Sequence, residues 1–174
     1  MKHHLPRLTI AELSNQDLPF FTELVTDPDI INPVPHAAWS EEEINDRFNE
    51  FTDYSKNPRD KTRVVWGIYE KGSSELIGLC ALLTNDEDQP ELGYRLRKPY
   101  WGKGYATEVS AYLIEYCFKT LNLELLSADA NIANPASIKI LEKFFSPVRD
   151  FFNAKENCWD RRFILYRSDW LNNS

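Results

Sequence analysis

Short segments of the chain alternate apolar and polar residues, and this period of two is typical of strands with one buried face. The clearest is Glu91-Leu92-Gly93-Tyr94-Arg95-Leu96, which follows a polar turn at residues 85–90. A turn at residues 71–74 between two β-rich segments indicates a hairpin. The pattern predicts strands at residues 5–13, 63–69, 76–83, 91–96, 123–130, 148–152 and 160–167.

Other segments repeat their apolar residues every three or four positions, as one face of an amphipathic helix requires. Residues 40–43 read Ser-Glu-Glu-Glu, a capping box that begins a helix because Ser40 and Glu43 satisfy each other's backbone N–H. Pro33 and Pro35 keep residues 30–39 in a loop. The pattern predicts helices at residues 15–27, from 40 to between 54 and 58, at 105–121 and from 134 onward.

Together these elements give the order β-α-α-β-β-β-α-β-α-β-β, which predicts an α/β fold with a mixed sheet. The chain of 174 residues contains no linker, repeat or low-complexity tract. We therefore expect residues 1–174 to form a single domain with its own core.

Composition narrows the classes of function without choosing one. The formal net charge of −7 disfavours a nucleic-acid-binding surface, which needs clustered Lys and Arg, and it suits a cationic acceptor such as an amine. Modest acidity that only keeps the protein in solution is the alternative. Cys80, Cys117 and Cys158 lie in apolar or aromatic contexts, so we expect buried thiols in a reducing cytoplasm and no metal site. The sequence has no signal region and no apolar run of membrane-spanning length.

A tight turn with two glycines joins the strand at residues 91–96 to the next helix. Such a turn exposes backbone N–H groups at a helix N-terminus, where they and the helix dipole favour an anion such as a phosphate. The spacing fits neither a dinucleotide-binding G-x-G-x-x-G turn nor a Walker loop. A plain strand-to-helix turn is the alternative. The segment is Trp101-Gly102-Lys103-Gly104-Tyr105-Ala106-Thr107.

The glycine turn, the element order and two further segments together resemble the GNAT superfamily of acyl-CoA-dependent N-acyltransferases. The RimJ/RimL-type branch, which acetylates N-terminal amines of ribosomal proteins, is the most similar. In the family's Gln/Arg-x-x-Gly-x-Gly/Ala loop, Trp101 replaces the first residue. The other segments are Asn134-Pro135-Ala136-Ser137 with Leu141-Glu142-Lys143-Phe144, and Pro33-Val34-Pro35-His36 ahead of Ser40.

The resemblance implies acetyl-CoA as co-substrate. The N–H groups of residues 102–107 would hold its pyrophosphate, with help from the Thr107 hydroxyl and the Lys103 charge. The pantetheine arm would lie along Tyr94, Leu96 and Arg97, where the central sheet splays open, and a backbone N–H of Leu96 or Arg97 would polarise the thioester. Asn134 would bond the arm, or serve only as a helix cap. The implied cofactor residues are Tyr94, Leu96, Arg97, Trp101, Gly102, Lys103, Gly104, Tyr105, Ala106, Thr107 and Asn134.

For catalysis the resemblance implies direct attack of the amine in a ternary complex. Glu91 would act as general base and Ser137 as general acid, because the tyrosine that many members use for the latter is Leu141 here. The alternatives are a solvated charge for Glu91 and a backbone-bonded serine for Ser137. His36, Trp39 and Tyr100 would line the acceptor pocket, although an exposed loop histidine and a packing tryptophan are the alternatives for the first two.

The acceptor is expected to be a primary amine, with a protein N-terminus favoured. A small-molecule amine or antibiotic is a second possibility. A CoA-binding module without catalysis is a third, and Leu141 is the observation in its favour. We expect a monomer or homodimer in the cytoplasm, without nucleic-acid, membrane or metal partners.

Overall fold

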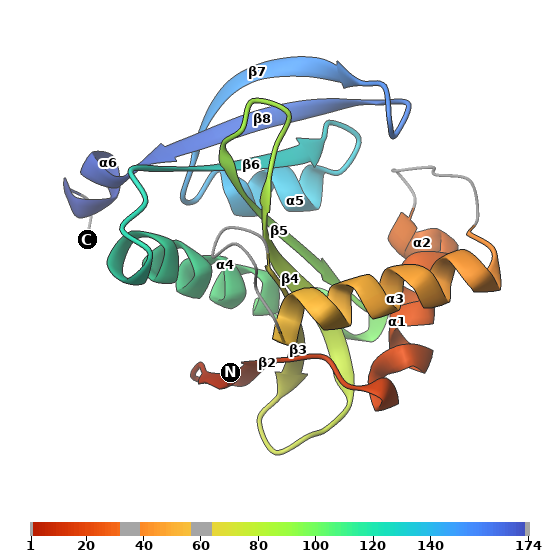
Figure 1. Ribbon diagram of the computed structural model, residues 1–174. Coiled ribbons are helices and arrows are strands. Elements are labelled where there is room, and N and C mark those ends of the chain that lie inside the picture. The colour runs from red at the N-terminus through yellow and green to blue at the C-terminus, as the bar shows by residue number, and fades with distance from the viewer. Residues whose placement is uncertain (1, 32–38, 57–63, 173–174) are drawn as a thin grey trace.

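The computed structural model describes residues 2–31, 39–56 and 64–172. Its strands form one open, mixed sheet in the order β1-β2-β3-β4-β5-β6-β8-β7 (Figure 1). Neighbouring strands are antiparallel except β5 and β6, which run parallel. The strands are β1 Lys2–His4, β2 Leu8–Ala11, β3 Val64–Glu70, β4 Leu76–Thr84, β5 Pro90–Leu96, β6 Leu125–Asn131, β7 Ser146–Asn153 and β8 Cys158–Tyr166.

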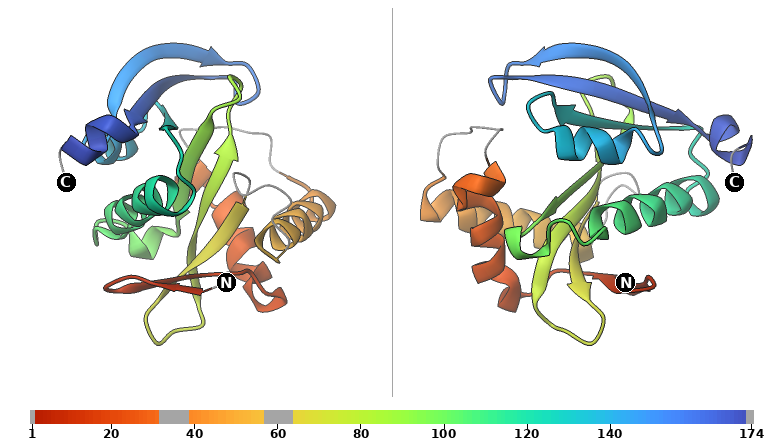
Figure 2. Two further views of the ribbon diagram at one scale, coloured as in Figure 1. Left: turned by 60° about the vertical axis from the view of Figure 1, so that its left-hand side comes forward. Right: turned by 180° about the vertical axis from the view of Figure 1, so that it is seen from behind.

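Helices cover both faces of the sheet (Figures 1 and 2). On one face α1, α2 and α3 lie beside strands β3 and β4. On the other face lie α4, which comes after β5 in the chain, and α5, which comes after β6. The helices are α1 Leu18–Thr26, α2 Pro28–Ile31, α3 Glu41–Lys56, α4 Tyr105–Glu115, α5 Pro135–Leu141 and α6 Arg167–Asn172. Single helical turns occur at Asn15–Asp17 and Lys98–Tyr100, and α4 continues as a π-helix at Tyr116–Thr120.

Two hydrophobic cores hold these layers together. The larger core joins α4 and α5 to the sheet and contains Leu92 and Leu96 of β5. The smaller core joins α1 and α3 to the other face through Phe21 and Phe48, whose ring centroids are 5.3 Å apart. Strand β5 therefore has a core on one side of the sheet and helix α1 on the other.

The parallel strands β5 and β6 diverge along their length. Both strands are fully described, yet they share one register pair, Glu91 with Ser127, at their beginnings. Because parallel strands keep hydrogen bonding only while they stay about 4.8 Å apart, the sheet opens toward Leu96 and Asn131. This opening is the predicted splay, and the mixed α/β fold class is confirmed.

The predicted elements are largely present, and the capping box at Ser40 has the expected geometry. The Ser40 N–H donates to Glu43 at 2.7 Å, and the Glu43 N–H donates to the Ser40 hydroxyl at 3.2 Å. All three cysteines are buried.

Three predictions about the fold were wrong in detail. Residues 5–13 do not form one strand, because the chain turns at Leu5, whose N–H donates to the Leu8 carbonyl at 2.9 Å, and β1 and β2 pair across this turn. The loop expected from residue 30 starts later, since Asp27 caps the short helix α2 through the Asp29 N–H at 2.9 Å. Helix α6 was not expected.

Candidate active site

A cleft of about 860 Å³ lies where β5 and β6 diverge, between the glycine turn and α5. It collects residues that are far apart in sequence, among them Glu91 on β5, Asp129 on β6 and Ser137 on α5. Of the predicted cofactor residues, Arg97 and Lys103 are not among those lining it. The lining includes Tyr94, Leu96, Trp101, Gly102, Gly104, Tyr105, Ala106, Thr107 and Asn134.

The glycine turn has the backbone conformation that an anion site requires. Gly102 and Gly104 have φ angles of 73° and 78°, in the left-handed region that favours glycine. In the first helical hydrogen bond of α4, the Glu108 N–H donates to the Gly104 carbonyl at 3.1 Å. The helix therefore offers no acceptor to the N–H groups of Tyr105, Ala106 and Thr107, which remain available to a ligand.

Arg7, from the turn between β1 and β2, holds the glycine turn in place. Its Nε donates to Glu108 at 2.7 Å and its Nη1 donates to the Lys103 carbonyl at 2.8 Å. The guanidinium also lies 4.8 Å from the centroid of the Tyr105 ring. Because Glu108 in the first turn of α4 is paired with Arg7, its negative charge is offset and repels an anion at this helix N-terminus less.

Trp101 is hydrogen-bonded to the end of β5. This bond gives a tryptophan a structural role at the position where the resembled loop has a polar residue. Its indole N–H donates to the Leu96 carbonyl at 2.8 Å. The ring is 45% exposed, so it covers the turn without being part of a core. Trp101 thereby fixes the glycine turn to the strand that borders the opening.

The prediction that Arg97 offers a backbone N–H to the ligand is wrong. That N–H donates to the Ile77 carbonyl of β4 at 2.9 Å. Its guanidinium bonds Glu23 at 2.8 Å and Glu75 at 2.5 Å, away from the cleft. Because N–H groups alternate in direction along an antiparallel strand, the Leu96 N–H points away from β4, toward the opening, and is the donor that remains.

Lys103 turns its charge toward aromatic rings. Its Nζ lies 4.8 Å from the centroid of the Tyr100 ring. A phosphate contact by Lys103 stays a prediction. Tyr100 does line the cleft, with its hydroxyl donating to Glu75 at 3.0 Å.

Glu91 is the cleft residue whose ionisation is most perturbed toward neutral pH. Burial and then the charge of Asp129 raise the pKa of Glu91 to about 7, against the opposing effect of Arg162. Arg162 is 1% exposed and bonds Asp129 at 2.8 Å and Asp86 at 2.5 Å. A carboxyl group with a pKa near neutrality in a cleft can accept a proton under physiological conditions.

Ser137 and Tyr94 face each other across the α5 side of the cleft. Burial raises the pKa of Tyr94, and a hydrogen bond with the Ser137 side chain partly opposes that rise. By strict hydrogen-bond geometry the buried Tyr94 hydroxyl has no partner among the described residues, so the contact with Ser137 is an imperfect one. A buried hydroxyl left in this state favours a ligand group beside it.

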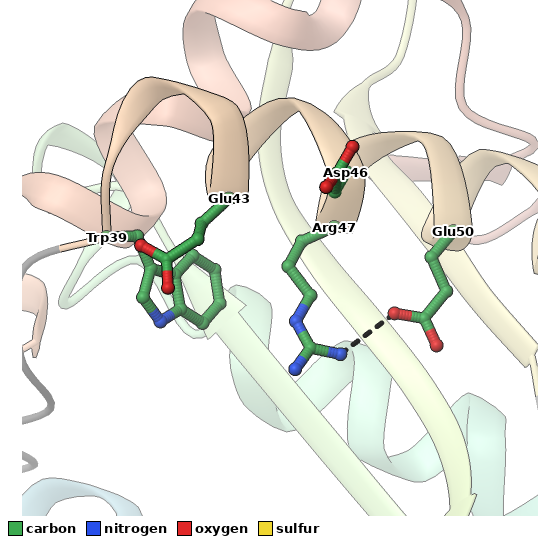
Figure 3. A pocket seen from close by; sticks show the side chains of 5 residues that line it. All are labelled: Trp39, Glu43, Asp46, Arg47 and Glu50. Atoms are coloured by element: carbon green, nitrogen blue, oxygen red, sulfur yellow. Dashed lines mark hydrogen bonds and ion pairs between the residues drawn. The ribbon is translucent and has the colours of Figure 1, made fainter.

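Asn134 caps α5, because its side chain accepts a hydrogen bond from the Ser137 N–H at 3.1 Å. The residue also lines the cleft, so the two predicted roles of Asn134 are compatible. His36 lies outside the described residues. Trp39 does not line the cleft but a separate hollow of about 320 Å³ on α3, with Glu43, Asp46, Arg47 and Glu50 (Figure 3). Its acceptor role stays a prediction.

Sequence reasoning missed Arg7, Arg95 and Arg162 as site residues. Arg95 lines the cleft and Arg162 fixes the acidic groups around Glu91. No local motif marks any of them, since each acts on a segment far away in the sequence. The alternation of β5 is the one signal for Arg95, because it places this residue on the same face as Glu91.

No cluster of three or more His, Cys, Asp or Glu side chains in the described part of the chain is arranged to hold a metal ion. Within the same residues, no helix is long and apolar enough to cross a membrane.

An open mixed sheet, a parallel pair that splays, and an anion-ready helix N-terminus at the open end are the arrangement that the resemblance to acyl-CoA-dependent transferases predicts. Comparison with known proteins agrees. A family model described as an acetyltransferase (GNAT) domain matches residues 7–144. The chain is 32% identical over 136 residues to "Uncharacterized N-acetyltransferase p20" of Bacillus licheniformis, and the match covers 67% of this chain and 76% of that protein.

Solved structures show the same fold. An acetyltransferase of the GNAT family from Bacillus anthracis superposes with a TM-score of 0.79 at 21% identity, covering 97% of this chain and 99% of that one. A point mutant of the spermidine N-acetyltransferase SpeG from Vibrio cholerae gives a TM-score of 0.71 at 21% identity, with 96% and 98% covered. The chain belongs to the GNAT family and is an acetyl-CoA-dependent N-acetyltransferase.

Proposed function

We propose that the cleft at the β5–β6 opening binds acetyl-CoA and transfers its acetyl group to a primary amine, with Glu91 as general base. One observation carries this proposal. The cleft joins backbone N–H groups suited to a pyrophosphate with a carboxyl group whose pKa is about 7. The first feature serves binding and the second serves proton removal, and neither is needed for a merely structural turn.

The residues of the cleft fit the co-substrate. The N–H groups of Tyr105, Ala106 and Thr107 would donate to the pyrophosphate, and the Tyr94 hydroxyl and the Leu96 N–H suit polar groups of an extended arm. When bound, acetyl-CoA supplies an activated thioester. Asn134 and Trp101 would border the arm and the turn, and Lys103 would add a distant charge.

In the proposed reaction Glu91 takes the proton of the attacking amine, directly or through a water molecule. Ser137, with the Tyr94 hydroxyl beside it, gives a proton to the departing thiolate. The Leu96 N–H donates to the carbonyl oxygen as it gains charge. The splay lets groups on opposite faces of β5 reach one bound thioester and its attacking amine, because no ladder of hydrogen bonds closes the sheet there.

For the acceptor we propose a protein N-terminal amine, as in the RimJ/RimL-type branch. The support is the combination of the Trp101–Thr107 turn and the Asn134–Ser137 segment, both of which border the cleft. The likeness to a spermidine N-acetyltransferase favours a polyamine as the second candidate.

Thermal unfolding with acetyl-CoA, followed by a thiol-release assay, tests this proposal. A ligand at one hundred times its Kd stabilises the folded state by about 2.7 kcal/mol. We expect such a shift, and thiol release when a peptide with a free N-terminus is added. Release with an N-terminally blocked peptide is the control and should be absent. No thermal shift at millimolar acetyl-CoA would contradict the proposed binding site.

A further inference from the structure

The face of β5 that is turned toward α1 carries two charged residues, Glu91 and Arg95. Leu92 and Leu96 point into the larger core on the opposite face. Because side chains alternate along a strand, Glu91, Gly93 and Arg95 share the α1 face. The contact from Arg95 Nη1 to the Leu24 carbonyl of α1, at 3.3 Å, agrees with this assignment.

Within the described part of the chain, the space between Glu91 and Arg95 is open. Both residues line the cleft, and a Cβ added at Gly93, midway between them, would meet no atom of the described residues within 4 Å. Four residues of extended strand separate the two Cα atoms by about 13 Å. The α1 face of β5 therefore has a carboxyl group at one end, a guanidinium at the other and room above the strand between them.

Arg95 is a partly buried cation that has no carboxylate partner among the described residues. Its hydrogen bond to Leu24 is long, and no described carboxylate lies within ion-pair distance of it. Glu156, in the β7–β8 turn, is near enough only for a weaker electrostatic effect. Arg97 and Arg162, by contrast, are each paired with more than one carboxylate.

This isolation is costly, because burial lowers the pKa of Arg95 while a guanidinium stays charged in proteins. A charge removed from water normally has a partner of opposite sign. The missing partner of Arg95 can come from a ligand, since the residue lines the cleft.

The other charges of the cleft do not offset Arg95. Asp29 of α2 is paired with Lys98, and Asp129 with Arg162. Lys139 and Lys143 of α5 add positive charge along the lining. Among the described lining residues, Glu91 is therefore the one carboxyl group without an ion-pair partner, and its raised pKa of about 7 leaves it only partly charged, although the whole chain has a net charge of −7.

We propose that the acceptor is a primary amine that also carries a carboxylate, which Arg95 binds while the amine lies toward Glu91. A guanidinium matches a single carboxylate in charge and in the spacing of its two oxygens. The inference rests on the proposed function and specifies its substrate class. A free amino acid and a peptide N-terminus followed by an acidic side chain both present this chemistry, and a polyamine does not.

The first test uses the unmodified enzyme and matched acceptors. Thiol release is measured with glutamate and its diamide derivative, with the C-terminally amidated dipeptides Ser-Asp and Ser-Asn, and with spermidine. We expect kcat/KM to be at least about tenfold higher for the carboxylate member of one pair, as a charge-assisted hydrogen bond predicts. The pair that shows the preference identifies the free amino acid or the peptide as the source.

Variants at Arg95 provide the second test. Arg95→Ala should lower kcat/KM for the preferred carboxylate acceptor by about tenfold or more, mainly through KM, and abolish the preference over the amide. Arg95→Lys should keep part of the preference for the carboxylate acceptor over the amide. In both variants the Kd of acetyl-CoA should stay within about twofold of that of the unmodified enzyme. If Arg95→Ala fails to fold, Arg95→Lys and the matched acceptor pairs still test whether Arg95 binds the carboxylate of the acceptor.

The outcomes separate the two proposals. Higher kcat/KM for spermidine or for the neutral amides would overturn the carboxylate inference and leave acetyl transfer by Glu91 intact. An equal loss for every acceptor in Arg95→Ala, or weaker acetyl-CoA binding, would also overturn it. No thiol release with any acceptor, despite acetyl-CoA binding, would refute the proposed catalysis and the inference together.

Discussion

The two ends of the cleft are built in different ways. At the glycine turn, main-chain N–H groups of consecutive residues are left without helical acceptors, and Gly102 and Gly104 give the turn its left-handed conformation. Around Glu91, side chains from β5, β6 and β8 set the chemistry through burial and charge. A ligand common to a whole family can be held by backbone that most sequences can supply. An acceptor that differs between members requires side chains that can change.

The largest expected effect is at the side-chain end. Glu91→Gln removes the proposed base but keeps the size of the residue. We expect kcat for acetyl transfer to fall by about 10² to 10⁴. The Kd of acetyl-CoA, measured by calorimetry, should change less than about twofold. Equal losses in both quantities would mean that Glu91 supports the fold of the cleft instead of the chemistry.

A matched pair of glycines sharpens the comparison. Gly104→Ala places a side chain at a φ of 78°, which costs about 1–2 kcal/mol, so acetyl-CoA should bind about 5- to 30-fold more weakly. The side chain that Gly93→Ala adds meets no atom of the described residues. It should leave acetyl-CoA binding unchanged and raise the KM of the acceptor. Calorimetry measures the Kd of acetyl-CoA and initial rates give the KM of the acceptor. Weaker acetyl-CoA binding in Gly93→Ala, or a raised acceptor KM alone in Gly104→Ala, would contradict the assignment of the glycine turn to the co-substrate and of β5 to the acceptor.

The ionisation of Glu91 also predicts how stability depends on pH. Its folded-state pKa of about 7 lies above the ordinary 4.5, so the folded state binds a proton more tightly than the unfolded state. The penalty for charging Glu91 therefore grows as pH rises from about 4.5 to 7, up to about 3 kcal/mol. Glu91→Gln should be more stable than the unmodified protein at pH 8 by an amount that is lost on lowering the pH to 4.

Urea unfolding at pH 4 and pH 8 measures this difference. Glu124→Gln is the control, because the Glu124 side chain is 84% exposed and its removal also deletes one negative charge. A gain in the free energy of unfolding that is equal in both variants would show a general effect of net charge.

The smallest expected effect is at Arg7, which supports the backbone end from outside. Arg7→Ala removes the bonds to Glu108 and to the Lys103 carbonyl, so the turn is held less firmly. Because the Arg7 side chain is 51% exposed, we expect only a few-fold weaker binding of acetyl-CoA. Arg47→Ala, which breaks an exposed pair on α3, should leave binding unchanged. Titration calorimetry gives the Kd of acetyl-CoA for both variants. Equal effects on this Kd would show that Arg7 does not support the binding site.

The same division explains what the sequence could predict. The glycine turn and the Ser40 capping box depend on neighbours within a few positions, and both have the predicted structure. The strand turn at Leu5 and helix α6 were missed, because β1 and α6 are short and depend on packing against the rest of the sheet.

For the site, most of the predicted catalytic and cofactor residues line the cleft, but residue types and spacing did not predict the partner of each charge. Arg97 was expected at the ligand, yet Glu23 and Glu75 bind its side chain and Ile77 its N–H. Arg95, two positions earlier, lines the cleft and has no such carboxylate among the residues that the structure describes. Alternation along one strand gives both arginines the same direction, so only the tertiary structure distinguishes their roles.

The pH dependence of kcat/KM for the acceptor tests the central claim, that Glu91 in this cleft is the base. The account predicts that kcat/KM rises with pH through an ionisation near pH 7, and that Glu91→Gln loses this ionisation together with most of the rate. A profile for Glu91→Gln that retains the same ionisation would contradict the claim.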